Sequence, residues 1–278
     1  MRSLEFAGHA AVELAAGPAR MVVVHDVGPR IAWFGLVGRE NLLYWDTAGA
    51  HREGAWRLYG GHRLWVTRPL ADESAEIHEP DNAPCVVEEL EDGVRIRAPR
   101  TTLGLEKTLE VRVRGAEWSV RHHLRNSSGL LWSGGAWALT CTLPSAETVY
   151  RIPLGGGPPT WDIATIIVPL SWGTHTSRLD DPQISFNGRV MEVRAQSDES
   201  KRMVRAPLGT IEMHDAARGL FRKVSPFDQN GAYPLDANLA LYVGPQRFMV
   251  EMESMSALRT LAPGMTLEHV EVWTIESL

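Results

Sequence analysis

The chain has 278 residues, of which 44% are hydrophobic and 22% charged, with 25 glycines, 17 prolines and only 2 cysteines. This composition is typical of a soluble globular protein and excludes disordered, collagen-like and disulfide-stapled chains. The net charge of −6 and the pI near 5.9 argue against nucleic acid or an anionic membrane as partner, because both require a clustered positive surface.

Neither an export signal nor a metal-binding cysteine motif is visible. Glu5, His9 and Glu13 interrupt the apolar residues near the start, and the apolar run from residue 163 to 170 is far too short to span a bilayer. Cys85 and Cys141 lie far apart with no second pair, which excludes a zinc knuckle and a redox CxxC motif. We expect a cytoplasmic protein with two buried thiols, and a disulfide between them stays open.

Alternation of apolar and polar residues predicts strands from one end of the chain to the other. In chain order, shorter predicted strands cover residues 21–25, 30–36, 85–90, 94–98, 189–194 and 239–243. The clearest alternation covers residues 103–114, where Lys107 interrupts the apolar face, and continues after Gly115 in residues 118–125. These two segments predict a hairpin with a glycine-containing turn.

The C-terminal part alternates in the same way. Residues 247–255 and 267–275 are predicted strands, separated by a Pro-Gly turn signal at residues 261–264. No stretch of a dozen residues has helical periodicity, and turn signals recur every 8–12 residues or so. We therefore predict an all-β protein with a single domain over residues 1–278, on the order of 20 strands and a large antiparallel two-sheet sandwich.

Residues 56–65 form the densest group of polar and aromatic side chains. A glycine pair precedes His62, Arg63 and Trp65, a mixture that suits a sugar site: an aromatic face for the ring and fixed donors for its hydroxyls. The alternative is a turn followed by a strand in which Trp65 is a core residue and Arg63 a surface cation.

Glu251 and Glu253 form a second candidate group. On a strand, residues two apart share a face about 7 Å apart, and two close carboxylates repel, which prepares an acid/base pair. The alternative is a solvated strand face.

The histidines suggest no metal site. His122 lies on the apolar face of its strand, where a core histidine is more common than a ligand, and no HxH, HExxH or HxxxH spacing occurs. Motifs for serine hydrolases, P-loop proteins and Rossmann folds are also missing. We expect neither a metal nor a cofactor.

Several motifs, in this order, resemble one uncharacterised bacterial family related to the galactose mutarotases, or aldose 1-epimerases. They are residues 60–65, 80–84, 104–107, 137–140, 233–234 and 251–253, and the turn at 261–264 that leads to His269, Glu271 and Trp273. The start, at residues 28–31 and 41–44, is also similar to the mutarotases.

The resemblance implies a galactose mutarotase-like supersandwich with a sugar site on its concave sheet. It also implies ring opening by a glutamate base and a histidine acid without a cofactor, with an arginine holding the sugar. Glu251 or Glu253 matches the base and Arg63 the arginine. The family's acid has no counterpart after Asn126, so either His62 or His122 substitutes for it or the chain does not epimerise.

We therefore predict a carbohydrate-active protein of the aldose 1-epimerase type, acting on a hexose or sugar acid. Its predicted catalytic residues are Glu251, Glu253 and His62, and its predicted substrate-binding residues are Arg63, Trp65, Lys107, His122, Trp137, Lys223 and Tyr233. A non-catalytic sugar-binding protein and a glycoside hydrolase or lyase on the same fold are the alternatives.

Overall fold

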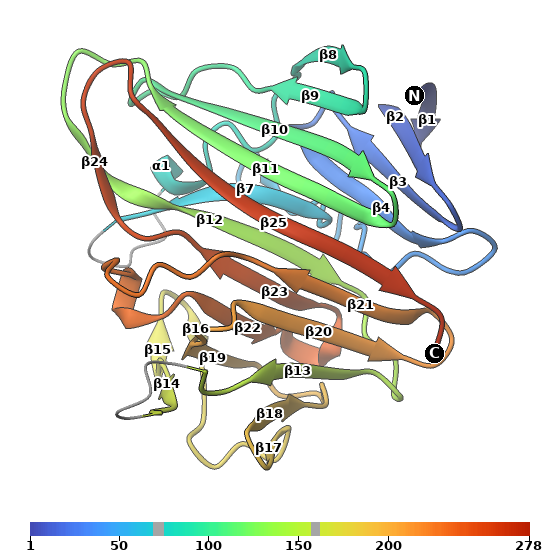
Figure 1. Cartoon of the computed structure of the whole chain (residues 1–278), viewed down its shortest axis with the longest axis vertical. Coiled ribbons are helices and arrows are strands. Elements are labelled where there is room, and N and C mark those ends of the chain that lie inside the picture. The colour runs from blue at the N-terminus through green and yellow to red at the C-terminus, as the bar shows by residue number, and fades with distance from the viewer. Residues whose placement is uncertain (69–74, 157–161) are drawn as a thin grey trace.

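The computed structural model describes residues 1–68, 75–156 and 162–278 (Figure 1). The regular secondary structure of the described residues is nearly all β. Their α-helical content is a single turn, α1 (Ala75–His78), and two short 3₁₀ turns occur at Pro234–Asp236 and Pro245–Arg247. None of the described helices is long and apolar enough to cross a membrane.

Sheet A is an antiparallel sheet in which late strands of the chain lie between earlier ones. Its order is β1 (Arg2–Phe6), β2 (His9–Ala16), β3 (Ala19–Val24), β4 (Arg30–Leu36), β7 (His62–Thr67), β12 (Trp132–Thr142), β23 (Val250–Met255), β22 (Leu239–Val243), β19 (Ser200–Arg205) and β14 (Thr165–Ile167), with β24 (Arg259–Leu261) paired to β12.

Sheet B is the second large antiparallel sheet. Its order is β17 (Ile184–Asn187), β18 (Val190–Val193), β13 (Val149–Pro153), β20 (Thr210–Asp215), β21 (Gly219–Val224), β25 (Thr266–Glu276), β11 (Glu117–Asn126), β10 (Leu105–Arg114), β9 (Gly93–Arg97) and β8 (Val86–Leu90). Two short ribbons, β5 (Arg52–Glu53) with β6 (Trp56–Arg57) and β15 (Ser171–Trp172) with β16 (His175–Thr176), complete the described strands.

The two sheets pack face to face around an aromatic centre. Phe34 of sheet A lies 5.3 Å, ring centre to ring centre, from both Phe221 and Trp273 of sheet B, and 5.6 Å from Trp118. All four residues are buried. Such edge-to-face aromatic contacts add specific geometry to the apolar burial that holds the layers together. The predicted all-β, two-sheet sandwich is confirmed.

The predicted hairpin is confirmed as β10 and β11. Val113 pairs with Trp118 next to the turn, and Gly115 has a φ of 63°, which a residue with a Cβ adopts at a cost. Lys107, which interrupts the apolar face of β10, is buried, and its ammonium donates to the carbonyl oxygen of Ile77 in α1 at 3.1 Å.

The C-terminal strands differ from the prediction at one boundary. The strand predicted from residue 247 begins at Val250, because Pro245 starts a 3₁₀ turn in which Gln246 and Arg247 have positive φ values of 56° and 59°. Such left-handed backbone cannot continue a strand. The two strands on either side of the Pro-Gly turn lie in different sheets, β23 in sheet A and β25 in sheet B.

Candidate functional site

A cavity of about 410 Å³ lies on the face of sheet A that points away from sheet B. Strands β7, β12, β23, β22 and β19 supply its floor, and the β5–β6 and β15–β16 ribbons supply parts of its rim. Its size is in the range of small-molecule sites, about 300–1,000 Å³. The lining includes Arg63, Trp65, Trp137, Trp172, His175, Lys201, Tyr242 and Glu251.

Strand alternation decides which residues reach this cavity. Arg63 and Glu251 line it, whereas the preceding residues, His62 and Val250, are buried on the other face of the same strands. Register then aligns the lining side chains in rows across the sheet. Cys141 of β12 pairs with Glu251, which pairs in turn with Tyr242 of β22.

Glu251 is held from below by two donors. The Arg63 guanidinium lies 3.4 Å from its Oε1 atom, and the Cys141 thiol donates to the same oxygen at 3.2 Å. Arg63 also donates to Cys141 Sγ at 3.1 Å, so the three groups form a closed triangle. Both cysteines are free thiols, which answers the question of a disulfide. Burial raises the pKa of Cys141, so its thiol stays protonated and can donate.

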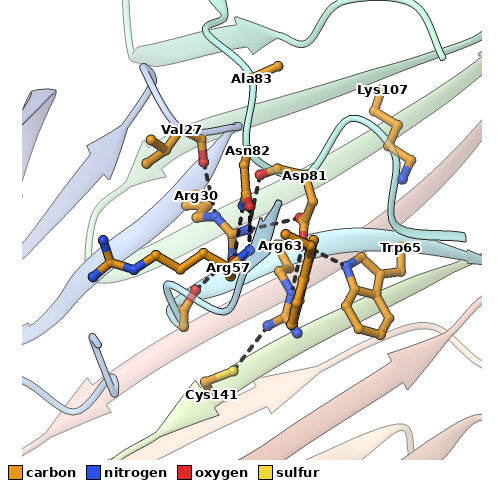
Figure 2. Close-up of polar contacts among 12 residues, drawn as sticks. Val27, Arg30, Arg57, Arg63, Trp65, Asp81, Asn82, Ala83, Lys107 and Cys141 are labelled. Atoms are coloured by element: carbon orange, nitrogen blue, oxygen red, sulfur yellow. Dashed lines mark hydrogen bonds and ion pairs between the residues drawn. The ribbon is translucent and has the colours of Figure 1, made fainter. Parts of the chain in front are cut away.

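Asp81 joins the arginines to two tryptophans (Figure 2). Its Oδ1 atom lies 3.0 Å from the Arg30 guanidinium, and its Oδ2 accepts the indole N–H groups of Trp56 and Trp65 at 2.9 and 3.2 Å. Arg63 lies 3.7 Å away. Burial alone would raise the pKa of Asp81, but Arg30 and Arg63 lower it, so the group is a carboxylate. Asp81 therefore fixes the orientation of the tryptophan side of the cavity.

Glu253 lies on the same face as Glu251 but deeper. It is fully buried, accepts the Trp137 indole N–H at 2.8 Å and pairs with the Lys201 ammonium at 3.1 Å. Burial and the neighbouring Glu251 raise its pKa. Its position behind Trp137 suits a support for the cavity wall rather than a group that meets a ligand.

Aromatic rings form two walls. On one side, Trp65 and Trp137 lie edge to face with ring centres 5.4 Å apart. On the other, Trp172 stacks on His175 at 5.5 Å and meets Tyr242 edge to face at 6.1 Å. Such faces suit the apolar C–H surface of a sugar ring.

His62, His122 and Lys223 lie in a second polar cluster, between the sheets. His62 Nε2 is 2.8 Å from His122 Nε2, and Lys223 pairs with Glu271 at 2.9 Å. Ser254 bridges Glu271 and His269. We call these six residues the inter-sheet cluster, and all of them are buried.

Burial holds the histidines of the inter-sheet cluster neutral. It lowers the pKa of His62 well below its usual range, that of His122 to about 3 and that of His269 to about 4. Burial alone would raise the pKa of Glu271, but Lys223 and His62 outweigh it and lower that pKa. The cluster thus contains an ionised carboxylate facing an ammonium and neutral imidazoles.

Within the described part of the chain, one group could hold a metal ion. His62, His122 and Glu271 each offer one ligand atom, and these three atoms lie within 4.8 Å of one another. No spacing in the sequence indicates this convergence, because the three residues come from three strands. The two imidazole nitrogens are at hydrogen-bond distance from each other, and His62 Nδ1 lies 2.8 Å from Thr140 Oγ1. These contacts occupy three of the four ring nitrogens, and His122 Nδ1 has no hydrogen-bond partner among the described residues.

Several predicted site residues therefore lie outside this cavity. His62, proposed as the acid, lies on the opposite face of sheet A from Glu251, and His122 and Lys223 point into the same inter-sheet cluster. Lys107 contacts α1 instead of the cavity lining. Tyr233 stacks on Phe227, and its hydroxyl accepts the Asp228 N–H at 2.8 Å. By contrast, Arg63, Trp65, Trp137 and Glu251 converge on the cavity.

Sequence reasoning missed Asp81, His175 and Lys201. Asp81 was within a motif that carried the family resemblance, and Lys201 is one of only three lysines, so both carried some signal. No pattern in the sequence indicates His175. Its place in the cavity depends on the β15–β16 ribbon, which lies in the chain between β14 of sheet A and β17 of sheet B.

Comparisons with solved structures point to one fold. The chain matches a galactose mutarotase-like protein from Clostridium acetobutylicum with a TM-score of 0.65 and 11% identity, over 100% of this chain and 98% of that chain. It matches one from Lactobacillus casei with a TM-score of 0.64 and 6% identity, over 96% and 100%. The chain has the galactose mutarotase-like fold.

A third solved structure has the same fold. An aldose epimerase homologue from C. elegans matches with a TM-score of 0.63 and 10% identity, over 97% of this chain and 99% of that one. No protein-family model matches the sequence, and no curated protein matches it. At such identities the galactose mutarotase-like fold is what the chain shares with these proteins, and its chemistry has to be argued from the cavity.

Proposed function

We propose that this chain is a carbohydrate-active protein of the aldose 1-epimerase type, which interconverts the anomers of a hexose or sugar acid. One observation carries the proposal: a single cavity brings together a carboxylate, an arginine and two aromatic walls. Solved proteins named as mutarotase-like or as aldose epimerase homologues share the fold and support the choice of reaction. We propose further that the chain acts as one cytoplasmic domain with a small sugar as its partner.

In this proposal Glu251 is the base. It lines the cavity, whereas Glu253 is fully buried behind Trp137. Glu251 takes the proton from the anomeric hydroxyl. The electron pair of that O–H bond becomes the second bond of a carbonyl, and the pair of the C1–O5 bond moves to the ring oxygen, which accepts a proton. The open aldehyde rotates about C1–C2 and closes on its other face by the reverse steps.

Arg63 and the aromatic walls hold the sugar. Arg63 offers fixed donors next to Glu251, and the Trp65 and Trp137 rings give a surface for the sugar's C–H groups. Proton transfer by a positioned group contributes about 10²–10⁴-fold to a rate, so two such groups suffice without a cofactor.

The test is anomer exchange. Freshly dissolved α-glucose, α-galactose and their uronic acids are followed by NMR with and without the protein, and binding of each sugar is measured in parallel. Acceleration over buffer that disappears in Glu251→Gln supports the proposal. Binding of a sugar without any acceleration of its exchange contradicts it.

A non-catalytic sugar-binding protein is the second candidate. It is favoured by the cavity face of β12, where Trp137, Leu139 and Cys141 stand and the mutarotase histidine has no counterpart. This candidate predicts a sugar-induced rise in melting temperature that Glu251→Gln retains, and no turnover in either protein.

A further inference from the structure

The proposed function lacks a proton donor for the ring oxygen, and the cavity rim contains a candidate. His175, from the β15–β16 ribbon, lines the cavity together with Glu251. Its side chain is 38% exposed, so a ligand in the cavity can reach it. The buried histidines of the inter-sheet cluster offer no such access, since their strands turn them away from the cavity.

A carboxylate behind the imidazole fixes which nitrogen faces the ligand. Glu199 Oε1 lies 2.6 Å from His175 Nδ1. Glu199 is itself held by the Tyr242 hydroxyl, which donates to Oε1 at 2.5 Å, and by the Thr176 backbone N–H at 3.1 Å to Oε2. With its Nδ1–H directed at a carboxylate, an imidazole accepts and releases protons at Nε2.

Ring packing restrains the imidazole in this position. Trp172 stacks on it at 5.5 Å with an interplanar angle of 25°, and Tyr242 meets it at 5.7 Å with an angle of 75°. Tyr242 also connects the two halves of the site, because it pairs directly with Glu251 across neighbouring strands. His175 and Glu251 are therefore separated by one tyrosine on the same side of sheet A.

We propose that His175 is the general acid of this site, with Glu199 as the residue that positions it. This inference rests on the proposed epimerase function and names the donor that function lacks. The step starts from the His175 imidazolium. Its Nε2–H bond breaks as the C1–O5 bond of the sugar opens, the proton passes to O5, and the neutral ring keeps its proton on Nδ1. Glu251 takes the hydroxyl proton in the same step. On closure, Nε2 takes the proton back from the C5 hydroxyl, so the protein returns to its starting state.

Anomer exchange in His175→Gln tests the proposal. We expect kcat to fall by about 10²–10⁴-fold while the sugar dissociation constant stays within a few-fold of the wild-type value. Glu199→Gln should lower kcat less, and in ¹⁵N NMR it should move the proton of the neutral His175 ring from Nδ1 to Nε2, because a glutamine amide can donate to Nδ1. Glu199 and Tyr242 lie at hydrogen-bond distance from His175 Nδ1, and Lys201 contacts the Trp172 and Tyr242 rings that pack beside it. A loss of folding would not produce this change of tautomer, so it separates positioning from a structural role.

His214 provides a matched control. It forms a second histidine–glutamate pair, with Nε2 2.8 Å from Glu212, on β20 of sheet B and away from the cavity lining. His214→Gln should leave kcat unchanged. Thermal melting of all three variants checks that they fold.

The outcomes separate the two proposals. An active wild type whose His175→Gln variant keeps its kcat overturns the role of His175 and leaves the epimerase proposal standing. A wild type that binds sugar without accelerating exchange overturns both. On the wild-type protein, ¹⁵N NMR should show that the neutral form of the His175 ring, which is left after the imidazolium gives up its Nε2 proton, carries its proton on Nδ1. A neutral ring protonated on Nε2 also contradicts the proposal.

Discussion

The spaces on the two sides of sheet A hold the same kinds of side chain in opposite settings. The cavity contains Glu251, Arg63 and Lys201, and the inter-sheet cluster contains Glu271, Lys223 and His62. Both sets are joined by ion pairs and flanked by tryptophans. Residue type therefore does not identify the functional site in this chain. The face of the strand on which a residue lies identifies that site, because this face determines whether a charged pair can contact a ligand or contacts only the other sheet.

The largest expected effect is the loss of turnover on the cavity side. Glu251→Gln should lower kcat by about 10²–10⁴-fold. It should also lower the unfolding free energy, because the buried Arg63 loses this carboxylate and keeps only Asp81 at 3.7 Å. Anomer exchange by NMR and urea unfolding measure the two quantities. If the variant kept the wild-type kcat, the Glu251 carboxylate would have no catalytic role. The cavity side of sheet A would then not differ in function from the inter-sheet side.

On the other face, Lys223→Met should act on stability. It leaves Glu271 buried without its cation, and breaking a buried pair in this way costs about 3–5 kcal/mol. Adding Glu271→Gln should recover part of the loss, because the uncompensated charge is then removed. Urea unfolding measures both variants. Equal stability of Lys223→Met and the wild type would contradict the ion-pair role.

The pH dependence of stability sharpens the same contrast. His122 and His269 have pKa values of about 3 and 4 in the folded chain because they are buried, against about 6.5 when unfolded. Between pH 6.5 and 4 the unfolded state takes up protons that the folded state does not, so stability falls as the pH falls, by on the order of 1 kcal/mol per unit for each histidine.

Urea unfolding at pH 7, 6 and 5 measures this slope. His269→Gln should make it shallower, and Trp132→Phe, which changes no titratable group, should leave it as it is. A slope that is the same in all three proteins would show that the inter-sheet histidines are not the source.

The smallest expected effect concerns the cavity wall. Trp137→Phe keeps an aromatic face but loses the indole N–H that Glu253 accepts, which costs about 0.5–1.5 kcal/mol. We expect sugar affinity to fall by up to about tenfold, by the same energy. Trp132→Phe, on the same strand but outside the cavity lining, is the control. Calorimetric titration measures both, and equal affinities would contradict a supporting role for Glu253.

The fold was predictable from the sequence because the alternation of apolar and polar residues that indicates strands is a local pattern. Alternation gave β4 and β22 with their observed bounds, and the β10–β11 hairpin follows from one glycine turn between two alternating segments. The start of β23 was placed three residues early, since positive φ values at Gln246 and Arg247 leave no mark on the hydrophobic pattern.

The site was predicted only in part. Adjacent residues on a strand point to opposite faces, so the grouping of His62 with Arg63 in one site could have been rejected from the sequence. The separation of Lys223 from Arg63 could not, because it depends on which sheet each strand joins. The contacts of His175 with Glu199 and of Lys201 with Glu253 join segments whose pairing no local pattern reports.

The position of β23 has a consequence for folding. This strand lies near the end of the chain, yet it sits between β12 and β22 in the middle of sheet A. Contacts between such distant segments form slowly, because the long intervening loop has to close first. Glu251 consequently joins Arg63 only when a late segment of the chain has inserted between strands made earlier. Sugar binding would then report complete folding, and a chain truncated before β23 should show none.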